Sequence, residues 1–232
     1  SGSAPGVYEV GDHINVTLES IVKQNDAGEI QAHNITNGET SLVDSTTPAL
    51  SHVIDMDLTE DVVLRSACAY AQGGVKQDNF NEDYPEGMIT AGTVTSEPVS
   101  YKVFRKTFFG ADKMGVTTPL GTSDAVRALP NVMKQFTKDD VLEAELGYGS
   151  TRFTIAYPAS SGYLRRVEYV EAGNANVLAQ FKRTALAVEG ANHAVEDLYH
   201  VYTLAWDQPI SGNMTLRAYC GSDTEPTPPP PR

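Results

Sequence analysis

Hydrophobic and polar residues alternate along much of the chain. From residue 14 to 19, and again from 54 to 59, every second residue is apolar. A period of two places the apolar side chains of a strand on one face of a sheet. Turn signals such as Asn37-Gly38 follow at short spacing. Several short strands with frequent turns are typical of a β-sandwich, so residues 7–100 are predicted to form an Ig-like domain.

The second half, residues 101–221, is predicted to form a β-rich domain with two short helices. Thr122 or Ser123 is predicted to cap the first helix, because a side-chain oxygen there accepts a hydrogen bond from the first turn. Pro130 is expected to end that helix. Strand patterns cover residues 152–157, 165–170, 199–205 and 213–219.

The second helix is predicted from Asn174 or Ala175 to Arg183. In that segment Val177, Leu178 and Phe181 share one helical face, and Lys182 and Arg183 suit the C-terminal end.

The two ends of the chain have their own compositions. Residues 1–6 have the character of a tag remnant or a cut end. Residues 222–232 contain a run of prolines and are predicted to be a polyproline II tail or linker. The alternative for this tail is a docking ligand for an aromatic groove.

Charge and hydropathy exclude two classes of partner. The 232 residues carry a formal net charge of -13, so a phosphate backbone is repelled and nucleic-acid binding is not expected. No apolar run approaches the roughly 20 residues that a spanning helix needs, so membrane insertion is not expected either. The two cysteines, Cys68 and Cys220, are too few for a disulfide framework, which favours free thiols and assembly in a reducing compartment.

Motifs of catalysis and cofactor binding are missing from the sequence. It contains no GxSxG, HExxH, P-loop or GxGxxG pattern. His193 and His200 are interpreted as surface or half-buried imidazoles, not as metal ligands. The acidic run from Asp78 to Asp83 offers oxygen donors of the kind calcium prefers but lacks the Gly and the terminal Glu of an EF-hand loop. A solvated acidic loop is the default interpretation, and a bound cation is the alternative. We therefore expect no catalytic residue, no cofactor and no metal.

Aromatic residues are the candidate recognition groups. The second half is rich in Tyr, and exposed Tyr or Trp beside polar residues stacks on sugar faces. Tyr148, Tyr163 and Trp206 are predicted as surface recognition residues, with Trp206 close to a loop.

Several segments, in this order and spacing, resemble the tailed-bacteriophage virion structural and tail-fibre protein family that carries an Ig-like domain. They are residues 8–11, 83–92, 101–110, 123–130, 153–158, 167–170, 174–176, 188–192 and 199–203. The resemblance implies a particle component without an established catalytic set.

The expected function is therefore a structural component of a phage virion, such as a tail fibre, collar or other appendage, that contributes to host-surface attachment. We expect assembly in the host cytoplasm, a homo-oligomer, and contacts with other virion proteins and with a host-surface glycan or protein. A bacterial cell-surface adhesin or carbohydrate-binding module is the alternative. A virion-borne glycan depolymerase is the third candidate, because paired carboxylates are not recognisable from sequence alone.

Overall fold

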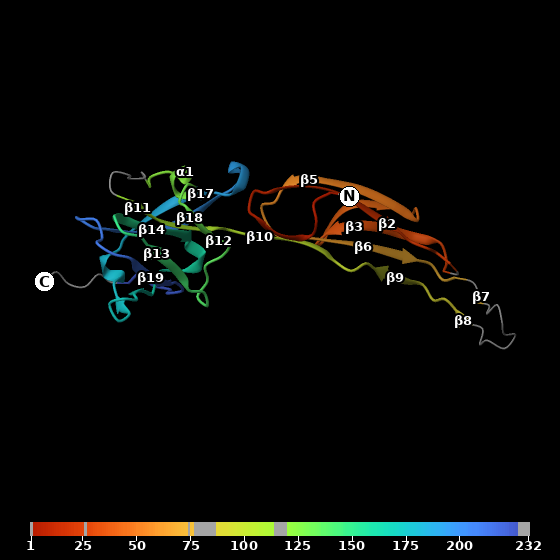
Figure 1. Ribbon diagram of the computed structural model, residues 1–232. Helices are drawn as coiled ribbons and strands as arrows, with labels where there is room; N and C mark the ends of the chain where they lie inside the picture. The colour runs from red at the N-terminus through yellow and green to blue at the C-terminus, as the bar shows by residue number, and fades with distance from the viewer. Residues whose placement is uncertain (1, 26, 74, 77–86, 114–119, 227–232) are drawn as a thin grey trace. The chain divides into compact units, whose positions relative to one another are not determined.

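The computed structural model describes residues 2–25, 27–73, 75–76, 87–113 and 120–226 (Figure 1). The acidic run 78–83 lies outside these residues, as does the end of the proline-rich tail. The predicted β-rich fold is confirmed, because strands in several sheets make up most of the ordered structure. The chain divides into two compact units. Unit 1 comprises Ser1–Tyr8 and Asp12–Val103, and unit 2 comprises Glu9–Gly11 and Phe104–Arg232.

Unit 1 contains one large and two small antiparallel sheets. The large sheet has the order β1-β10-β6-β3-β4, with β9 also paired to β6, and a second sheet pairs β2 with β5 along nine residues (Figure 1). The strands are β1 (Gly6–Glu9), β2 (His13–Ile21), β3 (Ile30–Asn37), β4 (Thr40–Ser45), β5 (Ala49–Asp57), β6 (Val62–Tyr70), β7 (Val75–Lys76), β8 (Gly87–Met88), β9 (Gly92–Thr95) and β10 (Val99–Phe104).

The core of unit 1 lies between these sheets. The predicted alternation is confirmed there: Ile14 and Val16 of β2 are buried, His13 and Asn15 are exposed, and Thr17 is half-buried. Ile54 of β5, opposite Val16, and Leu64 and Tyr101 of the large sheet complete the same cluster. Both sheets therefore bury one face against a shared core.

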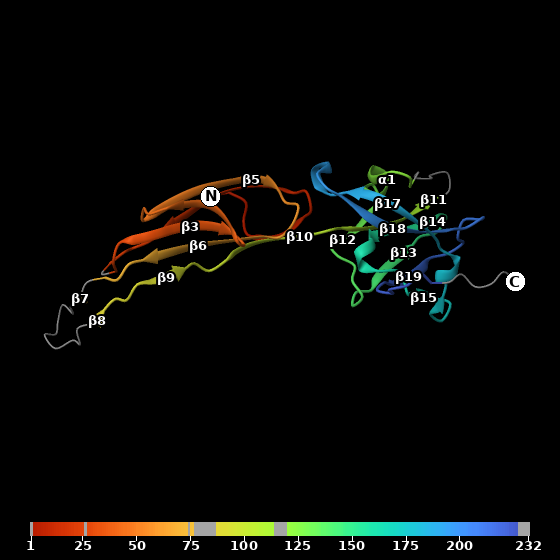
Figure 2. The same cartoon turned by 180° about the vertical axis from the view of Figure 1, so that it is seen from behind.

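Unit 2 has three layers: a helix, a five-stranded sheet in the order β12-β11-β14-β18-β17, and a four-stranded sheet in the order β13-β19-β15-β16 (Figure 2). The strands are β11 (Thr107–Lys113), β12 (Asn131–Met133), β13 (Leu142–Leu146), β14 (Ser150–Pro158), β15 (Arg166–Tyr169), β16 (Ala175–Asn176), β17 (Lys182–Glu189), β18 (Glu196–Ala205) and β19 (Met214–Tyr219). The helices are α1 (Ser123–Arg127) and the 3₁₀ turns η1 (Ala159–Ser161), η2 (Leu178–Gln180) and η3 (Ala191–His193).

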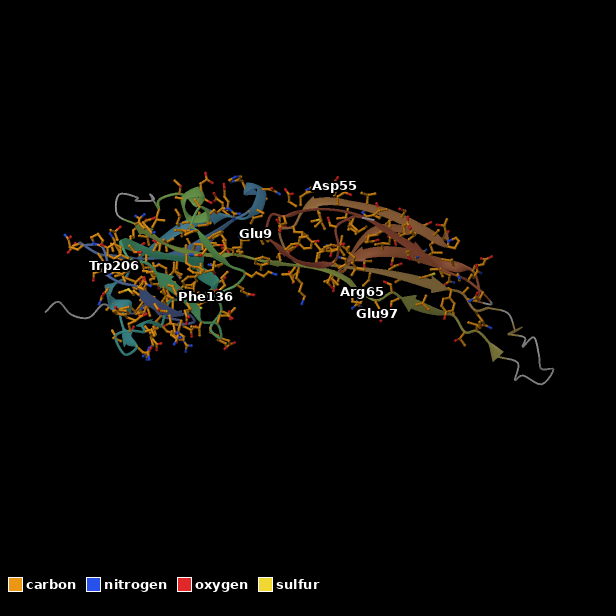
Figure 3. All side chains as sticks on the ribbon, viewed as in Figure 1. Glu9, Asp55, Arg65, Glu97, Phe136 and Trp206 are labelled. Carbon is orange, nitrogen blue, oxygen red and sulfur yellow. The ribbon has the colours of Figure 1, made fainter. Side chains whose placement is uncertain are left out.

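The main core of unit 2 is enclosed by its two sheets. Phe136 is fully buried there and packs edge-on against Tyr157 of β14, with ring centroids 5.3 Å apart (Figure 3). A second cluster on the opposite face of the five-stranded sheet includes Phe108 and Val201, and α1 covers it with Val126. Strand β14 is therefore buried on both faces over most of its length.

The first predicted helix is confirmed. Helix α1 begins after Thr122, whose hydroxyl accepts a hydrogen bond from the backbone N–H of Ala125. The second predicted helix is wrong. Residues 174–183 form β16, η2 and the start of β17, because the Asn176 side chain accepts bonds from the N–H groups of Val167 and Leu178, and Lys182 onward pairs with β18. Sheet pairing thus outweighs the local helical spacing of apolar residues.

Candidate functional site

A cluster of stacked aromatic and cationic side chains lies beside strands β17 and β18 of the five-stranded sheet in unit 2. The ring of Tyr163, which follows η1, stacks on the His200 imidazole of β18 with centroids 4.6 Å apart and planes 19° apart. The Arg183 guanidinium of β17 lies 5.2 Å from the centre of the Tyr163 ring. Arg183 and His200 are brought together by the β17–β18 hairpin, in which Arg183 pairs with Tyr202, two residues from His200.

Arg183 is held by a carboxylate from the end of the chain. Its Nε and Nη2 atoms each donate a hydrogen bond to Glu225, both at 2.7 Å. This two-pronged pairing raises the pKa of Arg183 and lowers the pKa of Glu225. The guanidinium fork therefore already holds one planar carboxylate, that of Glu225, in a two-pronged geometry.

The surroundings of His200 favour its neutral form. Burial, followed by the charge of Arg183, lowers the pKa of His200. Only 6% of the residue is exposed, and its imidazole forms a flat support on which the Tyr163 ring stacks.

A cavity of about 490 Å³ opens beside Arg183. Its walls include the apolar residues Leu178 and Phe181 and the three cations Arg165, Lys182 and Arg183, against one acid, Glu225. A second hollow of about 540 Å³ is lined by Tyr163, η1 and polar groups of residues 221–223. The candidate site thus combines positive charge with an aromatic edge, in a chain whose net charge is -13.

The structure separates the three predicted recognition residues. Tyr163 belongs to the cluster described above, whereas Trp206 directly follows β18 and packs, half-buried, against the main core (Figure 3). Tyr148 is 73% exposed in the turn between β13 and β14. Tyr163 stacks on His200, whereas Trp206 follows Ala205 at the end of the same strand. His200 and Ala205 are five positions apart along β18, which corresponds to about 17 Å. The three side chains therefore do not form one surface.

Sequence reasoning missed Arg183, His200 and Glu225 as neighbours. The local spacing of apolar residues predicts Arg183 at the end of a helix, and Glu225 lies 42 residues further along the chain. The alternation around residues 199–203 does predict the strand that carries His200, but only the hairpin register identifies the residues across from it.

A different cluster in unit 2 carries potential metal ligands. Asp124 of α1, Glu189 at the end of β17 and His193 at the end of η3 place one ligand atom each within 4.8 Å of one another. The Nδ1 atom of His193 forms a hydrogen-bonded ion pair with Glu189, which raises the pKa of His193.

In unit 1, His13 also lies between two carboxylates. Its Nε2 atom is 2.7 Å from Asp55 and its Nδ1 atom is 2.9 Å from Asp57. The two acids occupy opposite ring nitrogens, so one ion does not reach all three groups. This arrangement suits a charged imidazole that bridges β2 and β5, not a metal site.

Two further findings concern the whole chain. Among the described residues, no helix has both the length and the apolar character needed to cross a membrane. No family model, curated protein or solved structure significantly matches the sequence or the fold.

Proposed function

We propose that this chain is a non-enzymatic structural component of a bacteriophage appendage, and that unit 2 attaches it to an anionic glycan on the host surface. One observation carries the attachment proposal: the cavity beside Arg183 is rich in cations although the chain as a whole is strongly acidic. The particle assignment is supported by the resemblance of the sequence segments to phage virion proteins.

The ligand chemistry follows from the walls of the cavity. Arg165, Lys182 and Arg183 favour a negative group, and the pairing of Arg183 with Glu225 has the geometry that a sugar carboxylate requires. The adjacent apolar and aromatic side chains suit the apolar face of a sugar ring. An acidic sugar, such as a uronic acid within a surface polysaccharide, combines both features.

The assembly part of the proposal concerns strand edges. Strand β5 runs for nine residues, and within the described ranges it pairs only with β2. Val53 in the middle of β5 is 56% exposed. A long open edge beside an exposed valine is a surface for strand addition, so we propose contacts with further copies of the chain or with other virion proteins. Light scattering at increasing protein concentration tests self-assembly.

Glycan binding is tested with charged and neutral polysaccharides. We expect the protein to bind a uronic-acid polysaccharide and not its carboxyl-reduced form. Arg183→Gln is expected to weaken binding about tenfold or more, because a hydrogen bond to a charged group contributes about 1.5–3 kcal/mol. Glu225→Gln is expected to strengthen polysaccharide binding severalfold, because the Arg183 guanidinium then loses its charged internal partner.

The matched control is Arg217→Gln. Arg217 pairs with Glu143 at 2.6 Å on β19, outside the lining of the cavity. Equal binding of both polysaccharides, or equal losses in Arg183→Gln and Arg217→Gln, contradicts the attachment proposal. Release of oligosaccharides by the wild-type protein contradicts its non-enzymatic part.

The same cavity would also serve a bacterial adhesin or carbohydrate-binding module. Mass spectrometry of purified phage particles separates the two proposals, because only a virion component co-purifies with capsid and tail proteins.

A further inference from the structure

We propose that Asp124, Glu189 and His193 of unit 2 form a binding site for a divalent transition metal of the zinc type. The three residues come from three elements, α1, β17 and η3, and their ligand atoms converge within 4.8 Å. In a tetrahedral zinc site with bonds of about 2.0–2.1 Å, ligand atoms lie about 3.3 Å apart. The present upper limit of 4.8 Å is about 1.5 Å longer, so the side chains have to close in when an ion binds.

The backbone around the three ligands is fixed by hydrogen bonds. The Ser123 hydroxyl accepts from the N–H of Glu189 at 2.9 Å, which joins the start of α1 to the end of β17. The loop that carries His193 is held at Gly190, whose N–H donates to Val195 at 2.7 Å. The Asn192 side chain donates to the carbonyl of Gly11 at 3.0 Å. The backbone segments that carry the three ligands are thus held in place before any ion arrives.

The conformation of the loop directs the imidazole toward the acids. Asn192 and His193 adopt φ angles of 53° and 55°, in the left-handed region that residues other than glycine rarely adopt. This turn brings Nδ1 of His193 onto the Glu189 carboxylate. The His193 side chain remains 66% exposed, so an ion has access from solvent.

One neighbouring cation needs to be considered. The Arg127 guanidinium donates to the Glu189 carbonyl at 2.8 Å, and its charge disfavours a bound metal. The same Nη1 atom also bonds to the carboxylate of Glu9 at 2.7 Å. Glu9, which is not a ligand, offsets part of this positive charge and shares its carboxylate between Arg127 and Lys106. Arg127 contacts Glu189 through its backbone carbonyl, so this bond leaves the Glu189 carboxylate for the metal.

The identity of the donors selects the class of ion. Two carboxylate oxygens and one imidazole nitrogen suit zinc, with water as the fourth ligand. Calcium and magnesium prefer oxygen donors only, in larger number.

The experiment is titration of the full, chelator-treated protein with Zn²⁺ and, separately, with Ca²⁺, by calorimetry. We expect one Zn²⁺ per chain to bind at this site and Ca²⁺ to bind it at least tenfold more weakly. His193→Gln and Asp124→Asn are each expected to lower the Zn²⁺ affinity at least tenfold. Fluorescence of Trp206, the single tryptophan of the chain, verifies that unit 2 of each variant is folded.

The matched control is His13→Gln, which removes a histidine that also lies between two acids but on opposite ring nitrogens. It should leave Zn²⁺ binding unchanged. A second readout is the thermal unfolding of unit 2, which Zn²⁺ should shift upward in the wild type and in His13→Gln only. Undiminished Zn²⁺ binding in His193→Gln, loss of binding in His13→Gln, or equally tight Ca²⁺ binding at the site overturns the proposal.

Discussion

The Oε1 atom of Glu9 lies 2.7 Å from the Nη1 atom of Arg127, although 118 residues separate them in sequence. Glu9 is only 4% exposed, and its second oxygen lies 2.6 Å from the ammonium group of Lys106. Burial by itself raises the pKa of the Glu9 carboxyl. The hydrogen bonds and charges of Arg127 and Lys106 outweigh that effect and hold the pKa below its usual value.

Replacing Glu9 by Gln is therefore expected to lower the free energy of unfolding of unit 2 by about 1–3 kcal/mol. This loss is smaller than the roughly 3–5 kcal/mol that breaking a fully buried ion pair costs, because Lys106 and Arg127 are both partly exposed. Since the pKa of Glu9 is lowered on folding, the advantage of the wild type is complete above the usual carboxyl pKa and disappears as the pH falls through the lowered value.

Denaturant unfolding followed by Trp206 fluorescence measures this effect in unit 2 alone. Glu143→Gln is the control, because Glu143 is half exposed and pairs with a single exposed arginine. The prediction is contradicted if Glu9→Gln lowers the free energy of unfolding no more than Glu143→Gln does. It is also contradicted if the difference between Glu9→Gln and the wild type persists in strong acid.

The imidazole of His13 is expected to titrate above the usual histidine range. The hydrogen bond to Asp57 is the main cause of its raised pKa, and Asp55 adds to it. Because folding raises the pKa of His13, the charged bridge between β2 and β5 stabilises unit 1 fully below the usual histidine pKa, as long as Asp55 and Asp57 are ionised. This contribution is lost as the pH rises through the folded-state pKa of His13. Titration by NMR should give a lower pKa for His13 in Asp57→Asn than in the wild type, and an unchanged value contradicts the interpretation.

Both thiols should be unreactive in the folded protein. Cys68 and Cys220 are free and buried, and burial raises the pKa of Cys68 and raises that of Cys220 to about 11. Because the thiolate is the reactive form, a thiol reagent at mildly alkaline pH should modify neither residue until denaturant is added, and then modify both. Rapid modification of one cysteine without denaturant would show that its surroundings open readily.

The sequence predicts those parts of the fold that depend on local pattern. Alternation identifies the strands with Ile14 and Ile54, and the hydroxyl of Thr122 marks the start of α1. The pattern around Leu178 is misleading, because apolar spacing over ten residues fits a helix as well as a strand joined to a 3₁₀ turn. Pairing with β18, which decides between them, is a long-range interaction that no local window contains.

The candidate sites are even less accessible from sequence. Tyr163, Arg183 and His200 each sit in an ordinary strand or turn context, and only sheet register stacks them. The same holds for Asp124 and His193, which lie on separate elements and come together at Glu189, the last residue of β17. A search for spaced motifs therefore finds neither group.

The assignment of Glu9–Gly11 to unit 2 has a consequence for the order of folding. Val10 accepts a hydrogen bond from Ala191 at 2.7 Å, and a β-carbon added at Gly11 would lie 2.0 Å from the carbonyl oxygen of Ala191, so this segment is closely fitted to unit 2. During synthesis, the segment Glu9–Gly11 leaves the ribosome before the stretch Asp12–Val103 of unit 1. Its partners emerge only after that unit is complete. Unit 2 can therefore close around this segment only after residues that follow Phe104 have been made, and a contiguous fragment that starts at Phe104 would lack the acid that pairs with Lys106 and Arg127.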